Sequence, residues 1–91
     1  MHAHAEILHR LLNPGVIAVV RVDHPSKALP TAEALLAGGV IAIELTMTIP
    51  NALEAIREAA GRLGGDALIG VGTVLDARVA SAAIDAGAQF V

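Results

Sequence analysis

The sequence has 91 residues, of which 55% are hydrophobic and 16% are charged, and its formal net charge is −3. This composition is typical of a folded chain with an apolar core and excludes an intrinsically disordered one. The six Lys and Arg residues and the single aromatic side chain are too few for a nucleic-acid-binding surface. The absence of cysteine excludes disulfides, Cys-ligated zinc, iron–sulfur clusters and thiol nucleophiles.

No segment of the sequence is apolar for long enough to cross a membrane. The longest aliphatic run, 16–20, falls far short of the roughly 20 residues that a bilayer requires. The amino-terminal segment also differs from a signal peptide, because its apolar residues are interrupted by His2, His4, Glu6, His9 and Arg10. We therefore expect no membrane partner and a cytoplasmic location.

The chain begins with a predicted helix and a predicted strand. Apolar residues at helical spacing between 7 and 12 indicate a short amphipathic helix that covers one end of the domain. The Asn13-Pro14-Gly15 segment is a turn signal. The β-branched and apolar segment 16–22 that follows predicts a strand buried on both faces.

A second helix and a second strand follow. Ser26 is a suitable N-cap for a helix that reaches Ala37, and Pro30 is tolerated because it falls in the first turn. Gly38-Gly39 ends this helix, as glycine commonly does. The segment 40–45 is again apolar and β-branched and predicts the second strand.

The remaining chain repeats this order. It contains two further predicted helices, which begin at Pro50 and at Asp76, and each of them is followed by glycine. The predicted elements are a helix from Pro50 to Leu63, a strand over 67–71, a helix from the N-cap Asp76 to Ala86, and the start of a fourth strand at 89–91.

Strands that alternate with helices are the pattern of βαβ units, which form a parallel sheet through right-handed crossovers. The predicted strands begin near 16, 40, 67 and 89 and so recur every 22 to 27 residues. The pattern fits both a barrel and an open doubly wound sheet. A complete barrel needs about 250 residues, and four strands with bare edges leave backbone groups unprotected. We therefore expect residues 1–91 to be one partial domain of a longer chain, or a half that must pair.

Function in parallel α/β folds gathers at the carboxyl ends of the strands. Glu44 is the most informative residue there, because it interrupts an apolar strand. Alternation assigns Ile43 and Leu45 to the helix-covered face and Glu44 to the crowded interior. A partly desolvated carboxylate in that position suits a general acid or base. The alternatives are that Glu44 ends the strand in solvent or forms an ion pair with Arg21.

Hydroxyl groups follow the second and third predicted strands. Thr46 and Thr48 precede a helix start and suit an anion-binding patch, although threonines there also cap helices. The Gly70-Val71-Gly72-Thr73 segment lets the backbone approach a ligand and then presents a hydroxyl. It lacks the Gly-Lys-Ser/Thr ending of a P-loop and the full dinucleotide-binding glycine pattern, so nucleotide binding has no support.

The other candidates for chemistry are weaker. His2, His4 and His9 suit a flexible tail better than a metal site, and no metal is expected. Ser26 and Ser81 lie on or at the start of predicted helices, and His24 is near only Ser26, so no serine triad is supported. Lys27 is the single lysine and lies where a loop becomes a helix. We interpret it as a solvated surface charge, since an amine nucleophile requires a desolvated pocket.

Four segments together resemble the 2-keto-3-deoxy-6-phosphogluconate (KDPG) aldolase family, which also acts on 4-hydroxy-2-oxoglutarate. They agree with that family in order and spacing as well as in residue identity, and they extend over almost the whole chain. The segments are Ala37-Gly38-Gly39-Val40, Ile43-Glu44-Leu45-Thr46-Met47-Thr48-Ile49-Pro50, Ile69-Gly70-Val71-Gly72-Thr73-Val74-Leu75 and Ala86-Gly87-Ala88-Gln89-Phe90-Val91.

The resemblance implies an α/β fold, namely the N-terminal half of a (β/α)₈ TIM barrel with parallel strands and an N-terminal helix. It implies a class I aldolase that splits KDPG into pyruvate and glyceraldehyde 3-phosphate through a lysine Schiff base, without a cofactor and as a homotrimer. Glu44 matches the glutamate that shuttles protons through water. Thr73 matches a threonine that holds the pyruvate carboxylate, and Arg21 matches an arginine that binds substrate carboxylate or phosphate.

The sequence departs from the family at two points. Many members have an arginine at the position of Thr48, so anion binding is expected to rest on Arg21, with Thr48 beside it. The Schiff-base lysine and the phosphate-binding loops of the family belong to later strands, so the 91 residues alone are expected to be inactive. Two alternatives stay open: an aldolase for 4-hydroxy-2-oxoglutarate or 2-keto-3-deoxy-6-phosphogalactonate, and a non-catalytic half-barrel that self-associates.

Overall fold

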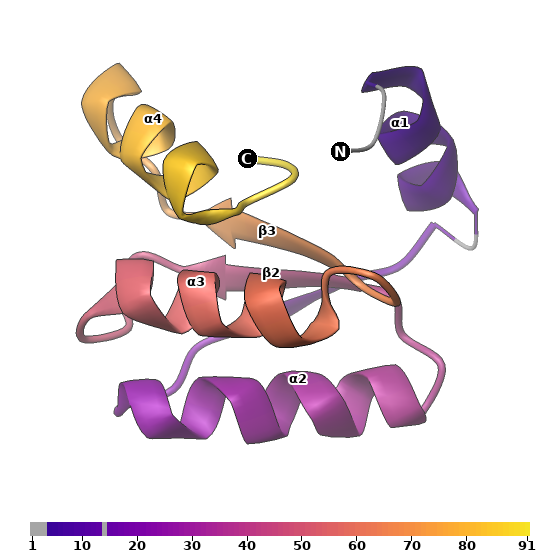
Figure 1. Cartoon of the computed structure of the whole chain (residues 1–91), viewed down its shortest axis with the longest axis horizontal. Coiled ribbons are helices and arrows are strands. Elements are labelled where there is room, and N and C mark those ends of the chain that lie inside the picture. Colours follow the sequence, from indigo (N-terminus) through magenta and orange to yellow (C-terminus); the bar gives the residue numbers. More distant parts are fainter. Residues whose placement is uncertain (1–3, 14) are drawn as a thin grey trace.

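Three parallel strands form the centre of the structure, and they lie in the order β1-β2-β3 (Figure 1). The computed structural model describes residues 4–13 and 15–91, so His2 and Pro14 lie outside the described residues. The elements are α1 (His4–Leu12), β1 (Ile17–Val20), the 3₁₀ helix η1 (Pro25–Lys27), α2 (Ala28–Ala37), β2 (Ala42–Thr46), α3 (Ala52–Leu63), β3 (Leu68–Gly72) and α4 (Ala77–Ala86).

The register of the sheet fixes which side chains share a face. Val19 is paired with Glu44, and Glu44 is paired with Gly70. Since parallel partners point to the same side and residues alternate along a strand, these three positions lie on one face. Ile43 and its partner Ile69 lie on the other.

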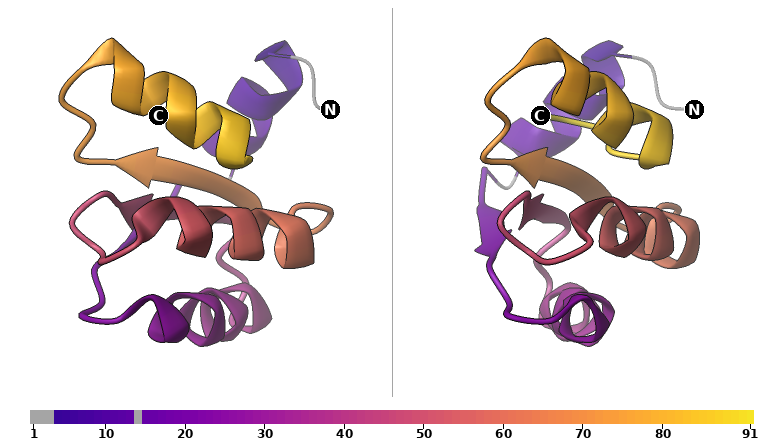
Figure 2. Two further views of the ribbon diagram at one scale, coloured as in Figure 1. Left: turned by 60° about the vertical axis from the view of Figure 1, so that its left-hand side comes forward. Right: turned by 90° about the vertical axis from the view of Figure 1, so that its left-hand side faces the viewer.

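One face of the sheet is covered by helices α2, α3 and α4, which lie on the same side in the right-hand view of Figure 2. Fully buried side chains of the strands meet small residues of the helices there, which lets the layers approach closely. The core includes Ile43, Leu45, Ile69 and Val71 from the sheet and Ala32, Ala55, Ile56, Ala59 and Ala83 from the helices.

The opposite face carries Ile17, Val19 and Glu44, and we call it the open face. Helices α2, α3 and α4 do not cover it, because all three lie on the core side (Figure 2). Ile17 and Val19 are 44% and 55% exposed, which is unusual for aliphatic side chains of a parallel sheet. The predicted burial of the first strand on both faces is therefore wrong within this chain.

Two predicted helix starts are wrong, and local hydrogen bonds explain both. His24, not Ser26, caps the first turn after β1: its imidazole accepts a hydrogen bond from the Ser26 N–H at 3.2 Å. The next turn is a 3₁₀ helix, and α2 begins only at Ala28. Pro50 lies in a turn rather than at a helix terminus, because Asn51 adopts a left-handed conformation (φ 52°) before α3 begins.

Residues 89–91, where the start of a fourth strand is predicted, are not a regular strand. They are nevertheless held against β3. The Gln89 N–H donates to the Ile69 carbonyl at 2.8 Å, and the Val71 N–H donates to the Phe90 carbonyl at 3.0 Å. The carboxyl-terminal segment thus continues the sheet beyond β3 by hydrogen bonds without a regular ladder.

The predicted amino-terminal helix is present as α1, and it lies at the amino-terminal end of the strands (Figure 1). An Arg10 guanidinium N–H donates to the Asp66 carbonyl at 3.5 Å, just before β3. His4 and His9 belong to this helix, so the interpretation of these two histidines as part of a flexible tail is wrong. Within 4–13 and 15–91, no helix is long and apolar enough to span a membrane.

The predicted N-cap of α4 is confirmed, and its removal should be measurable. Asp76 accepts a hydrogen bond from the Val79 N–H at 2.8 Å. We expect Asp76→Ala to reduce the free energy of unfolding by about 1 kcal/mol, because a helix donor loses its partner. Urea unfolding followed by circular dichroism measures this loss, and Asp76→Asn is the control that should retain most of the stability.

Candidate active site

The carboxylate of Glu44 is the centre of the candidate site. Glu44 is the third residue of the central strand β2, lies on the open face and is half-buried. Its carboxyl group lies against Gly72 of β3: a Cβ atom built on Gly72 would come within 2.5 Å of the Glu44 Cδ. The predicted face is therefore correct, while the crowding around Glu44 comes from β3 and not from a closed interior.

A phenyl ring occupies the neighbouring position on the same face. A Cβ atom on Gly70 would overlap the ring of Phe90, approaching its Cδ1 to 2.5 Å. The sequence suggested that Gly70 and Gly72 admit a ligand to the backbone, but side chains of the protein itself fill the space above both. The sequence contains one signal for this arrangement: two glycines, Gly70 and Gly72, alternate along a strand in a chain with a single aromatic residue, Phe90.

Two threonines at the end of β2 form a hydroxyl pair. The Oγ1 atoms of Thr46 and Thr48 are 2.6 Å apart, and Thr46 is only 1% exposed whereas Thr48 is exposed. The turn is tied to β3, since the Met47 N–H donates to the Gly72 carbonyl at 2.9 Å. Thr48 is thus held at the carboxyl end of the sheet by a buried neighbour, with its own side chain open to solvent.

Thr73 follows β3 directly and has a positive φ of 58°. This left-handed conformation is a clear outlier for a β-branched residue and costs about 1–2 kcal/mol. Strained residues of this kind concentrate at functional sites, where the surrounding structure fixes them. The side chain is exposed at the same end of the sheet as Thr48.

Arg21 lies immediately after β1 and is exposed. One further step of the strand alternation assigns it to the open face with Val19. Among residues 4–13 and 15–91, no ion pair joins Arg21 to Glu44, so the structure does not support that alternative. Of the four predicted residues, Glu44 lies in the middle of β2, whereas Arg21, Thr48 and Thr73 follow the carboxyl ends of the neighbouring strands β1, β2 and β3.

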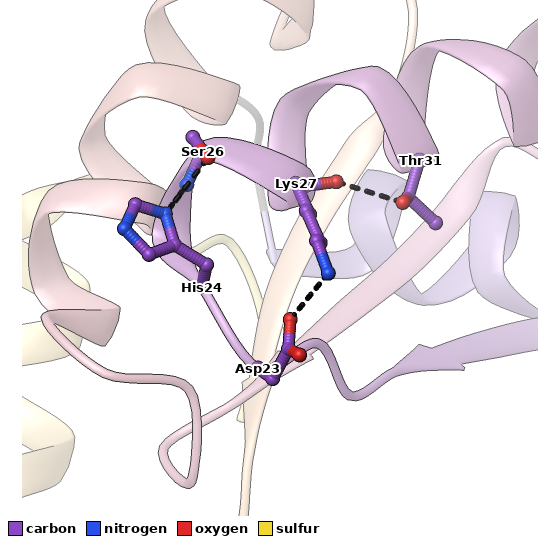
Figure 3. Close-up of polar contacts among 5 residues, drawn as sticks. All are labelled: Asp23, His24, Ser26, Lys27 and Thr31. Atoms are coloured by element: carbon purple, nitrogen blue, oxygen red, sulfur yellow. Dashed lines mark hydrogen bonds and ion pairs between the residues drawn. The ribbon is translucent and has the colours of Figure 1, made fainter.

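Lys27 has the surroundings of a surface charge (Figure 3). Its ammonium group is 2.7 Å from Asp23 Oδ1, and its side chain is 61% exposed. The hydrogen bond and the positive charge of Lys27 hold the pKa of Asp23 below its usual range. An amine in this setting lacks the desolvation that an imine-forming lysine requires.

The His24–Ser26 contact beside Lys27 is a local cap (Figure 3). His24 Nδ1 lies 2.7 Å from Ser26 Oγ and also accepts from the Ser26 backbone N–H. In the part of the chain that the structure describes, no carboxylate hydrogen-bonds to this imidazole, and no three His, Asp or Glu side chains gather as a metal site. Neither a serine triad nor a metal centre arises there.

One hollow of the described structure lies away from these residues. It has a volume of about 850 Å³ and is lined by α1 and by the carboxyl-terminal ends of α3 and α4, including Ile7, Ala60 and Ile84. None of the predicted site residues contributes to it. Arg21, Thr48 and Thr73 are instead exposed at the end of the sheet, and Glu44 is half-buried there.

The sequence profile of the family described as KDPG and KHG aldolase matches residues 7–91. The chain belongs to this family. The 2-dehydro-3-deoxy-phosphogluconate aldolase of Pseudomonas aeruginosa is 43% identical over 79 residues, which are 84% of this chain and 34% of that protein. The solved KDPG aldolases have the TIM-barrel fold. The strands and helices of this chain form the amino-terminal part of that fold.

Solved structures of KDPG aldolases agree with this assignment. The enzyme of Legionella pneumophila, with pyruvate captured at low pH as a covalent carbinolamine, is similar with a TM-score of 0.75 and 38% identity over 81% of this chain and 35% of that one. A designed cube-shaped cage made by fusing symmetric oligomeric domains is similar with a TM-score of 0.76 and 33% identity, over 80% of this chain and 27% of that one. The chain spans about a third of the length of the curated relatives that it matches.

Proposed function

We propose that this chain supplies the amino-terminal part of a class I aldolase that cleaves KDPG into pyruvate and glyceraldehyde 3-phosphate. The observation that carries the proposal is the position of Glu44. Its carboxylate is half-buried on the open face of the central parallel strand, in a chain of the KDPG and KHG aldolase family. That position suits a proton-transfer group whose substrate lies at the carboxyl ends of the strands.

The chemistry requires several proton transfers. A lysine amine adds to the C2 carbonyl of the substrate, and the resulting carbinolamine loses water to give an iminium ion. Removal of the C4 hydroxyl proton breaks the C3–C4 bond, which releases the aldehyde and leaves an enamine. Protonation at C3 and hydrolysis then release pyruvate and return the amine. Glu44 moves these protons, through water, in our proposal.

The anionic groups of the substrate have candidate partners at the same end of the sheet. The Thr73 hydroxyl is assigned to the pyruvate carboxylate, and Arg21 and Thr48 to the other anionic groups. Arg21 is exposed there, and its planar guanidinium binds carboxylate or phosphate with two parallel hydrogen bonds. The carbinolamine captured in the Legionella enzyme supports the same covalent route for this family.

The proposal requires a lysine from outside these 91 residues. Lys27 is the only lysine in the sequence, and its exposed ion pair with Asp23 argues against imine formation. We therefore expect the 91-residue chain alone to be inactive. A cytoplasmic location remains part of this proposal.

A chimeric enzyme tests this function. Residues 7–91 replace the matching segment of the Pseudomonas aeruginosa aldolase, and the chimera is treated with pyruvate and borohydride. Intact-mass measurement should show a reduced adduct on the chimera and on its Lys27→Met variant, but none on the 91-residue chain. A chimera that folds by circular dichroism yet forms no adduct contradicts the proposal, and an adduct on the short chain would contradict the role assigned to Lys27.

Substrate choice is tested with the same chimera. We expect KDPG to be cleaved fastest, with glyceraldehyde 3-phosphate as the aldehyde product. The alternatives are 4-hydroxy-2-oxoglutarate, which gives glyoxylate, and 2-keto-3-deoxy-6-phosphogalactonate, the epimer at C4. Comparison of kcat/KM for the three compounds identifies the substrate, and a higher value for either alternative would replace KDPG in the proposal.

Assembly is a second part of the proposal, and it has a competing form. A homotrimer of complete barrels is proposed, and the similarity to a cage made from symmetric oligomeric domains supports an oligomer. The competing form is a non-catalytic half-barrel that self-associates, which the exposed Ile17 and Val19 of the open face favour. A stable folded monomer of the 91-residue chain in size-exclusion chromatography would exclude the half-barrel.

A further inference from the structure

Two glycines of β3 have no conformational reason to be glycine. Gly70 and Gly72 lie in a regular strand, and neither has the positive φ that distinguishes Gly15, Gly39 and Gly87. Any residue can adopt their backbone angles, and glycine in a strand interior is unfavourable. The reason for glycine must therefore be the space above each Cα atom.

The space above Gly72 is occupied by the Glu44 carboxylate. A Cβ atom at position 72 would lie 3.1 Å from Glu44 Cγ and closer still to Cδ and Oε2. Real Cβ contacts essentially never fall below 3.0 Å, as those to Cδ and Oε2 would, so a side chain at 72 would force the carboxyl group to move. The end of a glutamate side chain moves easily, which makes such a change cheap for stability but large for the direction of the carboxylate.

The space above Gly70 is occupied by the ring of Phe90. Gly70 is the register partner of Glu44, so this ring lies over the strand position directly beside Glu44. Its backbone is fixed by the hydrogen bond from Val71 N–H, and the neighbouring Gln89 Oε1 accepts from Ile69 N–H at 3.3 Å. The carboxyl group of Glu44 lies over Gly72, two residues further along β3, so the ring lies on its amino-terminal side.

We propose that Gly72 and Phe90 are positioning residues for Glu44. Gly72 leaves the volume into which the carboxylate folds, and the Phe90 ring above Gly70 prevents it from turning toward the amino-terminal end of the strands. The two together direct Glu44 toward the carboxyl end, where Thr48 and Thr73 lie. This inference rests on the proposed aldolase function for its kinetic consequence, but its geometric part does not.

The geometric part is tested on the 91-residue chain by nuclear Overhauser contacts. Contacts are expected from the Glu44 Hγ protons to Gly72 Hα and from the Phe90 ring to Gly70 Hα. The Gly72→Ala variant should lose the first set and keep the second, with an unchanged pattern of strand amides. Absence of both contacts in the unaltered chain would overturn the inference, whatever the chain's activity.

The kinetic part is tested in the chimera with the Pseudomonas aeruginosa enzyme. Gly72→Ala should lower kcat for KDPG by about 10- to 100-fold with little change in KM, because a misplaced proton-transfer group slows chemistry more than binding. Glu44→Asp shortens the side chain and so already withdraws the carboxylate from Gly72. The double variant that combines Gly72→Ala with Glu44→Asp should therefore have a kcat no lower than that of the slower single variant. Gly61→Ala, where a Cβ meets open space, is the matched control with unchanged kcat.

The outcomes separate this inference from the proposed function. An active chimera whose kcat is unchanged by Gly72→Ala, or strictly additive losses in the double variant, would overturn the positioning role. A chimera without any pyruvate adduct would instead contradict the proposed function, and the Overhauser contacts would still decide the geometry. Phe90→Leu keeps an apolar residue but removes the ring. It should also lower kcat, but by less than Gly72→Ala does.

Discussion

Glu44→Gln in the chimera should lower kcat for KDPG cleavage by about 10²–10⁴-fold, the contribution that a positioned general acid or base makes. Glutamine keeps the length and shape of the side chain but cannot accept and return a proton. Among the residues of β1, β2 and β3, Glu44 is the one that carries a carboxylate, so no neighbouring strand position can take over its role. Steady-state assay of the released pyruvate measures the effect.

The control for this prediction is Glu58→Gln. Glu58 is exposed on α3, on the other side of the sheet, and its substitution should leave kcat within about two-fold, as expected for a surface change. Slow borohydride trapping of pyruvate should persist in Glu44→Gln, because the amine nucleophile is untouched. A Glu44→Gln chimera with undiminished kcat would remove Glu44 from the mechanism.

Ile43→Ala should reduce the free energy of unfolding by about 2–5 kcal/mol, because it leaves a cavity in a close-packed core. Ile43 is completely buried at the centre of the sheet, against the small residues of the helices. A loss of this size is a large part of the 5–15 kcal/mol that holds a typical domain together. Urea unfolding must be followed by circular dichroism, since the sequence contains neither Trp nor Tyr.

Val19→Ala is the matched control for Ile43→Ala. Val19 lies in the same sheet but on the open face, and 55% of it is exposed. We expect a loss below about 1 kcal/mol, which is the range of strand propensity differences. Equal losses at the two positions would mean that the open face is buried in solution, as a self-associating half-barrel requires.

The order of elements could be predicted because each segment carries its own periodicity and its own stop signal. The apolar strands, the Asp76 cap and the glycines at 38 and 87 act locally, and the structure confirms them. Helix starts are not decided by the sequence in the same way, because several polar residues compete for one role. His24 and Ser26 both suit a cap, and only the three-dimensional turn decides that the imidazole accepts the hydrogen bond.

The face of Glu44 could also be predicted, since alternation along one strand needs no knowledge of its neighbours. The surroundings of Glu44 could not. They depend on the register that pairs Glu44 with Gly70, and on the backbone hydrogen bonds that fix Phe90 against β3. Such contacts join segments far apart in the chain, and composition or spacing does not encode them directly. The roles of Arg21, Thr48 and Thr73 remain predictions.

Under the proposed function, in which Thr73 holds a carboxylate, its left-handed backbone sets stability and recognition against each other at one position. Glycine or asparagine adopts this conformation more easily than a β-branched residue, so a laboratory selection for heat resistance alone would favour their appearance at 73. Only a selection that also rewards capture of a carboxylate ligand would retain threonine. The residue recovered from such competing selections therefore reports which demand dominates at the end of β3.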